Sequence, residues 1–247
     1  MMGRFPRLYA IVDRATLDAR TPQRASSPGT PCGMKVGEFA RELREGGVRL
    51  VQYRDKVNGS ATPANKFAGG PGPQEILRAA NEIDEAFEGV EVMRIMNDRA
   101  DLAVLAGWDG VHVGQGDLSV EAARRVLDPT HHAMKLRDEW GTRIVGVSTH
   151  NEEQVRAAIE SGPDYVAVGP VFATVSKANP EPVVGLELVR RARAMTDLPI
   201  VAIGGITLAN ARSVIEAGAD SVAVIGGLLV EGRRVREVAR DFLEVLG

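Results

Sequence analysis

Cysteine is almost absent from this sequence of 247 residues. Because Cys32 is the only cysteine, no disulfide bond can form within the chain, which suits a reducing compartment and predicts a cytoplasmic protein. Cys32 lies in a segment rich in proline, serine and glycine, and nothing near it in sequence would activate its thiol. A role for Cys32 as a nucleophile is therefore not expected.

An excess of charge of one sign is also lacking, and so are long apolar stretches. The 30 Lys and Arg residues nearly balance the 33 Asp and Glu residues, for a formal net charge of −3. This balance gives no reason to expect nucleic acid or an anionic membrane as a partner. No apolar stretch approaches the ~20 residues that a membrane span needs, and the first residues lack the apolar core of a signal peptide.

Aromatic residues are scarce as well, at 4 %, although hydrophobic residues make up 44 % of the chain, so we expect a sizeable aliphatic core. The apolar residues form short runs, typical of buried parallel strands, that alternate with amphipathic stretches of helical periodicity. The predicted strands are 8–12, 48–53, 90–95, 110–113, 144–148, 165–168, 200–203 and 221–224. The predicted helices are 36–43, 74–87, 100–106, 119–126, 151–161, 186–195, 208–217 and 235–246.

Strand–helix units in this number and a length of about 250 residues are typical of a (βα)8 barrel. We therefore predict an α/β fold, a single (βα)8 TIM barrel with inserted loops, as one domain over residues 1–247. A doubly wound open sheet is the alternative, although the first strand–helix turn has no G-x-G-x-x-G pattern. A turn that recurs before three strands favours stacked units: Gly107-Trp108-Asp109, Gly162-Pro163-Asp164 and Gly218-Ala219-Asp220.

Three stretches are longer than the turns of a compact barrel. Residues 16–33 and 57–72 are rich in turn-forming residues and are interpreted as loops that follow strands, at the end where barrel enzymes bind substrates. They form either a lid over the site or a surface elaboration. Residues 128–142 follow a predicted helix, so we expect them at the opposite end of the barrel.

Charged residues come directly after the second apolar run. Gln52, Arg54 and Lys56 alternate with Tyr53 and Asp55, so the first three side chains are expected to project to the same side, toward the mouth of the barrel. Arginine and lysine in that position are costly to desolvate unless an anion meets them, and together they suit diphosphate oxygens. The alternative is a surface strand end with solvated charges.

Carboxylates follow the next two runs. Asn97 and Asp98 come after the third run and Asp117 comes after the fourth, so neighbouring strands would bring them together. Mg²⁺ prefers a few carboxylate oxygens together with water and substrate phosphate, and we therefore predict Mg²⁺ as the cofactor, with Asp98 and Asp117 as its ligands. The alternative is helix capping, because both aspartates precede predicted helices.

Glycines end the last two strands. Gly204 and Gly205 follow the seventh run, and Ile225, Gly226 and Gly227 follow the eighth, so backbone N–H groups there are free to face an anion. Phosphate binding after strands seven and eight is common in (βα)8 barrels. A double glycine usually forms only a turn, but its occurrence in both positions favours a phosphate site.

Hydroxyl groups and a lysine follow the fifth and sixth runs. Thr174, Ser176 and Lys177 belong to a loop, in which the lysine either closes over a phosphate group or is simply solvated. Ser148 ends the fifth run and is predicted to hydrogen-bond a substrate. Ser148 and His150 lack the acid and the oxyanion turn of a hydrolytic triad, so that chemistry is not expected.

Together, the residues described above resemble those of the thiamine phosphate synthase family, and the resemblance extends over essentially the whole chain, from Tyr9 to Phe242. The segments that carry the resemblance are VQYRDK (51–56), NDRADLA (97–103), GVHVGQGD (110–117), GVSTH (146–150), GPVFATVSK (169–177) and AIGGIT (202–207). The resemblance implies a transferase on a (βα)8 barrel. It joins 4-amino-5-hydroxymethylpyrimidine diphosphate to 4-methyl-5-hydroxyethylthiazole phosphate and releases pyrophosphate, after the diphosphate has left to give a pyrimidine-methyl cation.

The same resemblance implies a role for each site residue. The diphosphate contacts would be Gln52, Arg54, Lys56, Asn97 and Lys177, and the Mg²⁺ ligands would be Asp98 and Asp117. Ser148 would contact the pyrimidine, and the thiazole phosphate would be held by Thr174, Ser176 and the backbone of Gly205, Ile225 and Gly226. The groups closest to the chemistry would be Arg54, Lys56, Ser148 and Lys177.

Three positions depart from the family pattern: Asp55 replaces the more frequent Glu, Ser176 a frequent Thr, and Gly226 a frequent Ser. Two other functions stay open. A thiazole tautomerase-like paralogue would use a histidine near the end of the fifth strand, for which His150 is available. A non-catalytic barrel that binds a phosphorylated ligand is the other. The sequence leaves the oligomeric state open, and a homo-oligomer is compatible with it.

Overall fold

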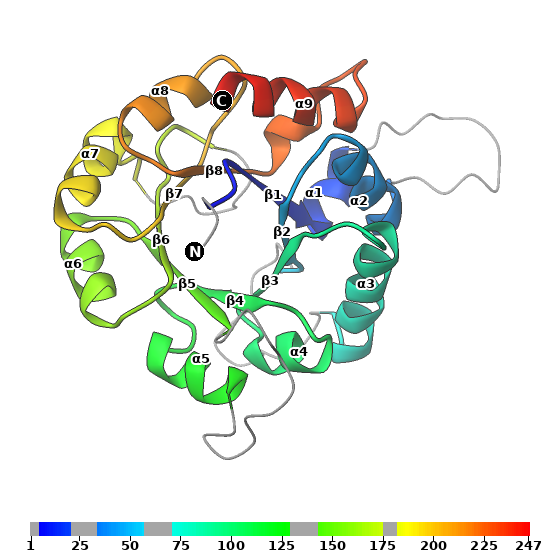
Figure 1. The fold of residues 1–247 in the computed structure, drawn as a ribbon, viewed down its shortest axis with the longest axis horizontal. Helices are drawn as coiled ribbons and strands as arrows, with labels where there is room; N and C mark the ends of the chain where they lie inside the picture. Colours follow the sequence, from blue (N-terminus) through cyan, green and yellow to red (C-terminus); the bar gives the residue numbers. More distant parts are fainter. Residues whose placement is uncertain (1–4, 21–33, 57–70, 129–142, 175–181) are drawn as a thin grey trace.

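The computed structural model describes residues 5–20, 34–56, 71–128, 143–174 and 182–247. In this part of the chain, parallel strands close into a barrel in the order β1 to β8, and the helices surround it (Figure 1). The strands are β1 Leu8–Asp13, β2 Leu50–Arg54, β3 Met93–Asn97, β4 Gly110–Val113, β5 Ile144–Thr149, β6 Tyr165–Val168, β7 Ile200–Ile203 and β8 Ser221–Val224. The predicted (βα)8 barrel is confirmed.

The helices follow the strands around the outside of the barrel. They are α1 Arg14–Arg20, α2 Val36–Glu45, α3 Pro73–Ala86, α4 Ala100–Leu105, α5 Val120–Leu127, α6 Glu152–Glu160, α7 Gly185–Met195, α8 Ala211–Glu216 and α9 Val235–Leu246, with a 3₁₀ turn η1 at Gly226–Leu228. Within the described residues, none of these helices has the length and apolarity to cross a membrane. The predicted bounds of β4, β6, β7, β8 and α9 are confirmed, whereas β2 lies later than expected and includes Arg54.

The prediction of a loop over residues 16–33 is wrong at its start, because α1 occupies Arg14–Arg20. The Asp13 carboxylate accepts hydrogen bonds from the Thr16 N–H at 2.9 Å and the Thr16 hydroxyl at 2.6 Å, as a helix N-cap does. Leu17 is 2 % exposed and packs into the core. Residues 21–33, 57–70 and 129–142 lie outside the described residues, so the lid interpretation stays a prediction.

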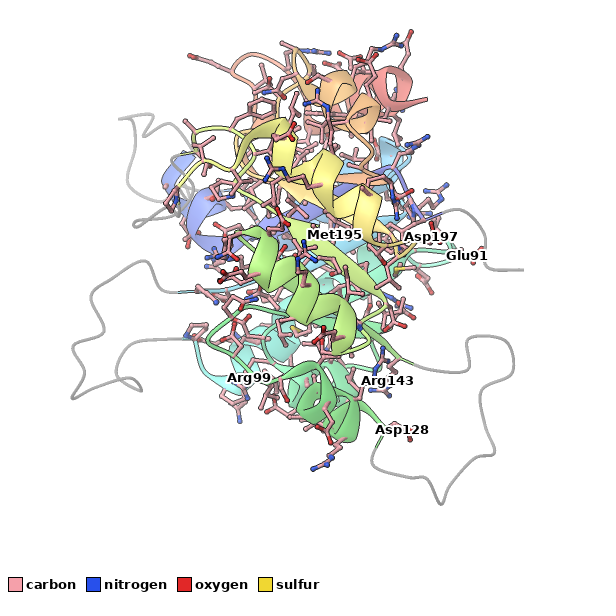
Figure 2. All side chains as sticks on the ribbon, turned by 90° about the vertical axis from the view of Figure 1, so that its left-hand side faces the viewer. Glu91, Arg99, Asp128, Arg143, Met195 and Asp197 are labelled. Atoms are coloured by element: carbon pink, nitrogen blue, oxygen red, sulfur yellow. The ribbon has the colours of Figure 1, made fainter. Side chains whose placement is uncertain are left out.

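The two ends of the barrel can be told apart from the side (Figure 2). Arg99, which follows β3, lies toward one end, whereas Glu91 and Arg143, which precede β3 and β5, lie toward the other. Asp128 and Arg143, the residues on either side of 129–142, are both at the end from which the strands start. The insertion itself lies outside the described residues, so its expected location stays a prediction.

Alternation along the strands separates two cores. Side chains that point outward pack against the helices, whereas a second cluster fills the inside of the barrel: Tyr9, Ile11, Leu50, Ile95, Ile144, Tyr165, Ala167, Val201 and Ala223. Because the period of a strand is two, the residues that follow these apolar ones on the same face also point inward. The inward-facing row of β2 is therefore Leu50, Gln52 and Arg54.

Aspartates of the recurring turn join neighbouring strands where the strands start. The N–H of each aspartate donates to the carbonyl of a residue at the start of the preceding strand, and its carboxylate accepts the N–H of that same residue. The pairs are Asp109 with Arg94, Asp164 with Val145, and Asp220 with Ile200. An arginine side chain pairs with each carboxylate: Arg94, Arg124 and Arg193. These turns thus set the register of three strand pairs.

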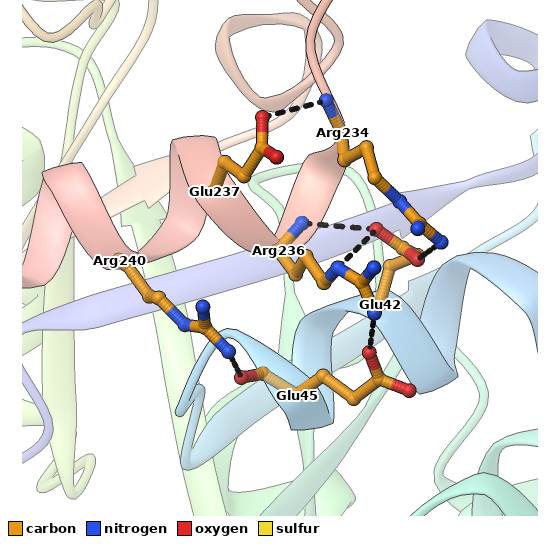
Figure 3. Close-up of polar contacts among 6 residues, drawn as sticks. All are labelled: Glu42, Glu45, Arg234, Arg236, Glu237 and Arg240. Atoms are coloured by element: carbon orange, nitrogen blue, oxygen red, sulfur yellow. Dashed lines mark hydrogen bonds and ion pairs between the residues drawn. The ribbon is translucent and has the colours of Figure 1, made fainter.

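Charged residues also join the last helix to the second helix (Figure 3). Glu42 of α2 is 9 % exposed, and its carboxylate accepts from Arg234 Nη2 at 2.7 Å and from the Arg236 backbone N–H at 3.3 Å. Arg236 also pairs with Glu45, and Arg240 donates to the Glu45 carbonyl at 2.9 Å. Glu42 therefore holds the N-terminal turn of α9, which completes the ring of helices.

We expect Glu42→Gln to lower the free energy of unfolding by about 1–2 kcal/mol, because it removes the charge that two arginines and a helix N-terminus share at a buried position. Urea denaturation measures this loss. Glu121→Gln is the matched control: its pair with Arg125 joins side chains that are 75 % and 77 % exposed, so its effect should stay below about 0.5 kcal/mol. Equal effects of the two substitutions would contradict the role assigned to Glu42.

Candidate active site

A cation lies between two carboxylates at the carboxyl ends of β3 and β4. Lys56 Nζ lies 2.6 Å from Asp98 Oδ2 and 3.8 Å from Asp117 Oδ2. Lys56 follows β2, so three successive strands contribute to this cluster. The structure thus brings together three residues that the sequence placed after separate strands, and two of them are the predicted metal ligands.

The alternative role of these aspartates as helix caps is wrong. Arg99 is the N-cap residue of α4 and no side chain caps that helix, while Ser119 caps α5 by accepting the Ala122 N–H at 3.1 Å. Asp117 instead accepts the Gly114 N–H at 2.9 Å, within its own loop. Both carboxylates are therefore available to the cation cluster.

The backbone of Asp98 is unusual. Its φ is 61°, and no other non-glycine residue in the described part of the chain has a positive φ. Aspartate tolerates this left-handed conformation better than most residues, but the conformation still costs free energy. Residues with such strained backbone tend to lie at functional sites. The Asp98 N–H donates to the His112 carbonyl at 2.8 Å, which holds the turn in place. The turn directs the carboxylate toward Lys56.

The two carboxylates differ in how readily they ionise. Burial raises the pKa of Asp98 to about 6, even though Lys56 lowers it, and the neighbouring Asp117 raises it further. Burial also acts to raise the pKa of Asp117, but the hydrogen bond with Asp98, the charge of Lys56 and the Gly114 N–H together bring it below its usual value. Asp98 is therefore the carboxylate that takes up a proton first as the pH falls, and a divalent cation would compete with that proton.

Gln52 and Arg54 lie side by side on the inner face of β2. Gln52 Nε2 donates to Asn97 Oδ1 at 2.9 Å, which orients both amides at the mouth of the barrel. Arg54, 8 % exposed, forms a buried ion pair with Asp13 at the end of β1. The surface alternative is thus wrong for Gln52 and Arg54, which are both buried, whereas Lys56 beyond the strand end is exposed. Asp13 was missed in the sequence, although it ends a strand on the same inward row as Tyr9 and Ile11.

Tyr53 and Asp55 point to the other side of β2. The Tyr53 hydroxyl donates to Asp55 Oδ2 at 2.8 Å, and both residues line a cavity of about 210 Å³ that also touches Asn97 and Asp98. Burial raises the pKa of Asp55, against the lowering effect of the Tyr53 hydroxyl. The alternation predicted for residues 52–56 is therefore confirmed by the contacts of both faces.

A larger cavity, of about 490 Å³, lies at the carboxyl ends of β5 to β8. Its lining includes these predicted site residues: Ser148, Thr174, Gly205, Ile225 and Gly226. Gly205 has φ +64°, and a Cβ at that position would lie 2.4 Å from the Ala173 carbonyl oxygen. Only glycine fits this turn, which leaves the backbone bare along one wall of the cavity. Ser176 and Lys177 lie outside the described residues.

Histidines approach this cavity from two strands. His150 lines it and its Nδ1 donates to the Gly169 carbonyl at 2.5 Å. Ser148 contacts a different histidine, His112 of β4, whose Nε2 lies 2.8 Å from Ser148 Oγ. His112 was not singled out in the sequence, although its place in a four-residue strand, two residues from Gly110, puts it on the inner face. The arrangement excludes a Ser148–His150 pair.

This arrangement can neutralise and hold a phosphorylated molecule. Arginine, lysine and amide donors gather at the carboxyl ends of β2 and β3, where Lys56 pairs with two carboxylates that suit a divalent cation. The described residues contain no group of three or more His, Cys, Asp or Glu side chains able to hold a metal by themselves, so phosphate or water oxygens would complete such a site. Fold and site together define the protein as a (βα)8-barrel enzyme that acts on phosphorylated small molecules.

Comparison with known proteins gives the particular family. The family described as "Thiamine monophosphate synthase" matches residues 27–228. Among its curated relatives, the thiamine-phosphate synthase of Koribacter versatilis is 48 % identical over 243 residues, which cover 98 % of this chain and 97 % of that protein. That of Geobacillus kaustophilus is 43 % identical over 194 residues, which cover 78 % and 77 %. The chain belongs to the thiamine monophosphate synthase family and is a transferase that makes thiamine phosphate.

Solved structures agree with this assignment. The thiamine phosphate pyrophosphorylase of Pyrococcus furiosus is 26 % identical, superposes with a TM-score of 0.71, and the match covers 98 % of this chain and 95 % of that one. A 3-hexulose-6-phosphate synthase matches with a TM-score of 0.60 at 16 % identity, which shows the shared barrel alone. The predicted family is therefore confirmed.

We expect Asp13→Asn to lower the free energy of unfolding by about 2–4 kcal/mol, because it leaves Arg54 buried without its counter-charge. Added pyrophosphate should then raise the thermal midpoint of this variant more than that of the wild type, since the anion supplies the missing negative charge. Asp18→Asn is the control, because the Asp18 and Arg14 side chains are 56 % and 50 % exposed. If pyrophosphate raised the thermal midpoint of Asp13→Asn no more than that of the wild type, the result would contradict the pairing of Asp13 with Arg54.

Proposed function

We propose that the chain joins 4-amino-5-hydroxymethylpyrimidine diphosphate to 4-methyl-5-hydroxyethylthiazole phosphate across the mouth of the barrel. The observation that carries this proposal is the position of Lys56 near both Asp98 and Asp117, at the same rim of the barrel as the cavity that the Gly205 turn lines. A diphosphate and a second phosphorylated molecule need two adjoining anion sites. The cation cluster supplies one and the glycine-lined cavity supplies the other.

The diphosphate is held at the cation cluster. Its contacts are assigned to Gln52, Arg54, Lys56, Asn97 and, outside the described residues, Lys177. Arg54 and Lys56 offer guanidinium and ammonium donors whose present partners are the carboxylates of Asp13 and Asp98. The pyrimidine-methyl C–O bond breaks and its electron pair leaves with the diphosphate, so the cations stabilise charge where it develops. The thiazole nitrogen then donates its lone pair to the pyrimidine-methyl cation.

Mg²⁺ is assigned to Asp98 and Asp117. The donor set fits this ion, since two carboxylates converge on one cation position and Lys56 Nζ already lies there at 2.6 Å from Asp98. Bound Mg²⁺ supplies neutralisation of the diphosphate charge. Asp98 and Asp117 would hold the ion through their carboxylate oxygens, and since the described residues contain no group of three or more metal-ligating side chains, substrate and water oxygens would complete the site.

The larger cavity takes the thiazole phosphate. Thr174 and the backbone of Gly205, Ile225 and Gly226 line its wall, and Ser176, which is outside the described residues, is assigned here from its place in the sequence. Ser148, at the border between this cavity and the barrel interior, is assigned to the pyrimidine. The groups that touch the reacting atoms are then Arg54, Lys56, Ser148 and Lys177.

The test is pyrophosphate release on mixing the purified protein with both substrates, with Mg²⁺ and then with EDTA. We expect release only with both substrates, and none after EDTA. A thiazole tautomerase that used His150, or a barrel that only bound its ligand, would release no pyrophosphate. Cytoplasmic location, assembly into a homo-oligomer and the extent of the domain stay predictions.

We expect Asp98→Asn to lower turnover by about 10²–10³-fold and to remove the response to added Mg²⁺. Asparagine also tolerates a positive φ, and the substitution relieves the cost of burying a charge, so the free energy of unfolding should stay within about 0.5 kcal/mol of the wild type. Steady-state assays across a Mg²⁺ titration measure the first effect and urea denaturation the second. Retained Mg²⁺ dependence in this variant would remove the metal assignment.

We expect Gly205→Val to raise the Michaelis constant for thiazole phosphate by about tenfold or more, because a side chain at φ +64° displaces the turn from the anion. The Michaelis constant for the pyrimidine diphosphate should change little. Gly89→Val is the control for strain alone, since Gly89 has φ +72°, with no atom within 4 Å of a Cβ there. A selective effect on the pyrimidine substrate would mean that the two sites are reversed.

A further inference from the structure

A continuous chain of polar side chains runs through the barrel interior below the cavity. The Tyr9 and Tyr165 hydroxyl oxygens are 2.9 Å apart, the Tyr165 hydroxyl lies 2.9 Å from His112 Nδ1, and His112 Nε2 lies 2.8 Å from Ser148 Oγ. Tyr9 and Tyr165 are 1 % and 0 % exposed, and His112 is 8 % exposed. Only Ser148, at the top, reaches the cavity.

The proton of the deepest hydroxyl decides the direction of this chain. Among the described residues, the only hydrogen-bond acceptor within reach of the Tyr9 hydroxyl is the Tyr165 oxygen. Tyr9 therefore donates to Tyr165, because a buried hydroxyl without an acceptor is costly. Tyr165 must then turn its own proton to His112 Nδ1. A histidine that accepts at Nδ1 carries its proton on Nε2, and that N–H donates to Ser148 Oγ.

The opposite direction leaves a buried group unpaired. If Ser148 donated to His112 Nε2, then His112 Nδ1 would donate to Tyr165 and Tyr165 to Tyr9, and the Tyr9 proton would face apolar side chains. A doubly protonated His112 has the same defect, since Tyr165 would again have to donate downward. Burial raises the pKa of both tyrosines well above the ordinary value, so both keep their protons and act as donors.

We propose that Tyr9, Tyr165 and His112 are positioning residues that fix Ser148 as a hydrogen-bond donor toward the cavity. Ser148 Oγ already accepts from His112, so its remaining proton is directed at a substrate atom with a lone pair. On an aminopyrimidine such an atom is a ring nitrogen, whereas the exocyclic amino group offers N–H donors. This step rests on the proposed function, in which Ser148 contacts the pyrimidine, and it selects which edge of the ring the site recognises.

Backbone geometry reserves the space for this chain. The ring of Tyr165 lies across β5 at Gly146, where an added Cβ would be 2.0 Å from the Tyr165 ring carbon Cζ. The His112 ring stacks on Tyr165 with centroids 5.6 Å apart, and Phe5 packs on Tyr165 at 5.4 Å. A glycine at 146 and these two contacts hold the phenol in one orientation, so its hydroxyl has little freedom to choose other partners.

The first test measures the tautomer of His112 in the free protein by ¹⁵N NMR with labelled histidine. At about pH 9, well above the ordinary histidine pKa of about 6.5, we expect a protonated Nε2 and an unprotonated Nδ1. The signal that vanishes in His112→Gln assigns the residue. His150 serves as the internal contrast, because its Nδ1 faces the Gly169 carbonyl and must carry the proton. An Nδ1-protonated His112 would overturn the proposal.

The second test uses Tyr165→Phe, which removes the donor to Nδ1 and frees Ser148 to turn its proton inward. We expect kcat/KM for the pyrimidine diphosphate to fall about tenfold, with an unchanged KM for thiazole phosphate. The wild type should discriminate by a similar factor against a pyrimidine in which the contacted ring nitrogen is replaced by C–H, and Tyr165→Phe should lose that discrimination. Phe5→Leu, which removes packing but no hydrogen bond, is the control.

The outcomes separate this proposal from the assignment of Ser148. The tautomer needs neither substrate nor turnover, so it decides the direction of the chain even if Tyr165→Phe fails to fold. Suppose that His112 Nε2 is protonated but the wild type uses the C–H analogue as well as the natural pyrimidine. The direction of the hydrogen bonds from Tyr9 to Ser148 would then stand, but the assigned contact between Ser148 and the pyrimidine would be wrong. In that case the proposed recognition of a ring nitrogen is wrong, while the synthase reaction itself stands on pyrophosphate release.

Discussion

Closure of the parallel sheet is the constraint on which the rest of the structure depends. Because all strands run in one direction, their carboxyl ends meet at one rim, and alternation sends every second side chain inside. Gln52 reaches Asn97 and His112 reaches Ser148 for this reason, although 45 and 36 positions separate the partners. A slip of one residue in any of these strands would turn its polar side chain out toward the helices. The aspartate turns at the start of the strands oppose such slips.

Charge balance inside the rim follows from that constraint. Arg54 is met by Asp13, and Lys56 is met by Asp98 and Asp117, so the cations that we propose for the diphosphate already have negative partners in the free protein. Burying an unpaired arginine would cost several kcal/mol, and the carboxylates avoid that cost before any substrate arrives. The site can therefore exchange partners within a folded barrel without depending on a ligand for its stability.

Much of the barrel could be predicted from the sequence, because short apolar runs and glycine turns report local structure. Periodicity of two placed Gln52, Arg54 and Lys56 on one side, and the contacts of Gln52 and Arg54 inside the barrel agree. The helix Arg14–Arg20 was missed, since it lies in a segment rich in turn-forming residues and owes its start to the Asp13 cap and its packing to Leu17. Helix capping was a plausible role for Asp98 and Asp117, because both precede helices in the sequence. That position alone does not show whether a carboxylate caps the helix or points toward the mouth of the barrel.

By itself, the sequence determined the fold class, the rim at which polar residues gather and the family, since these depend on local periodicity and on motifs in a fixed order. Only the tertiary structure decided which groups touch. Tyr9 and Tyr165 are 156 positions apart and bear no motif, yet closure of the barrel brings their hydroxyls to 2.9 Å. Pairing of Asp13 with Arg54 and of His112 with Ser148 likewise depends on strand register and burial, which are properties of the closed sheet and not of any segment alone.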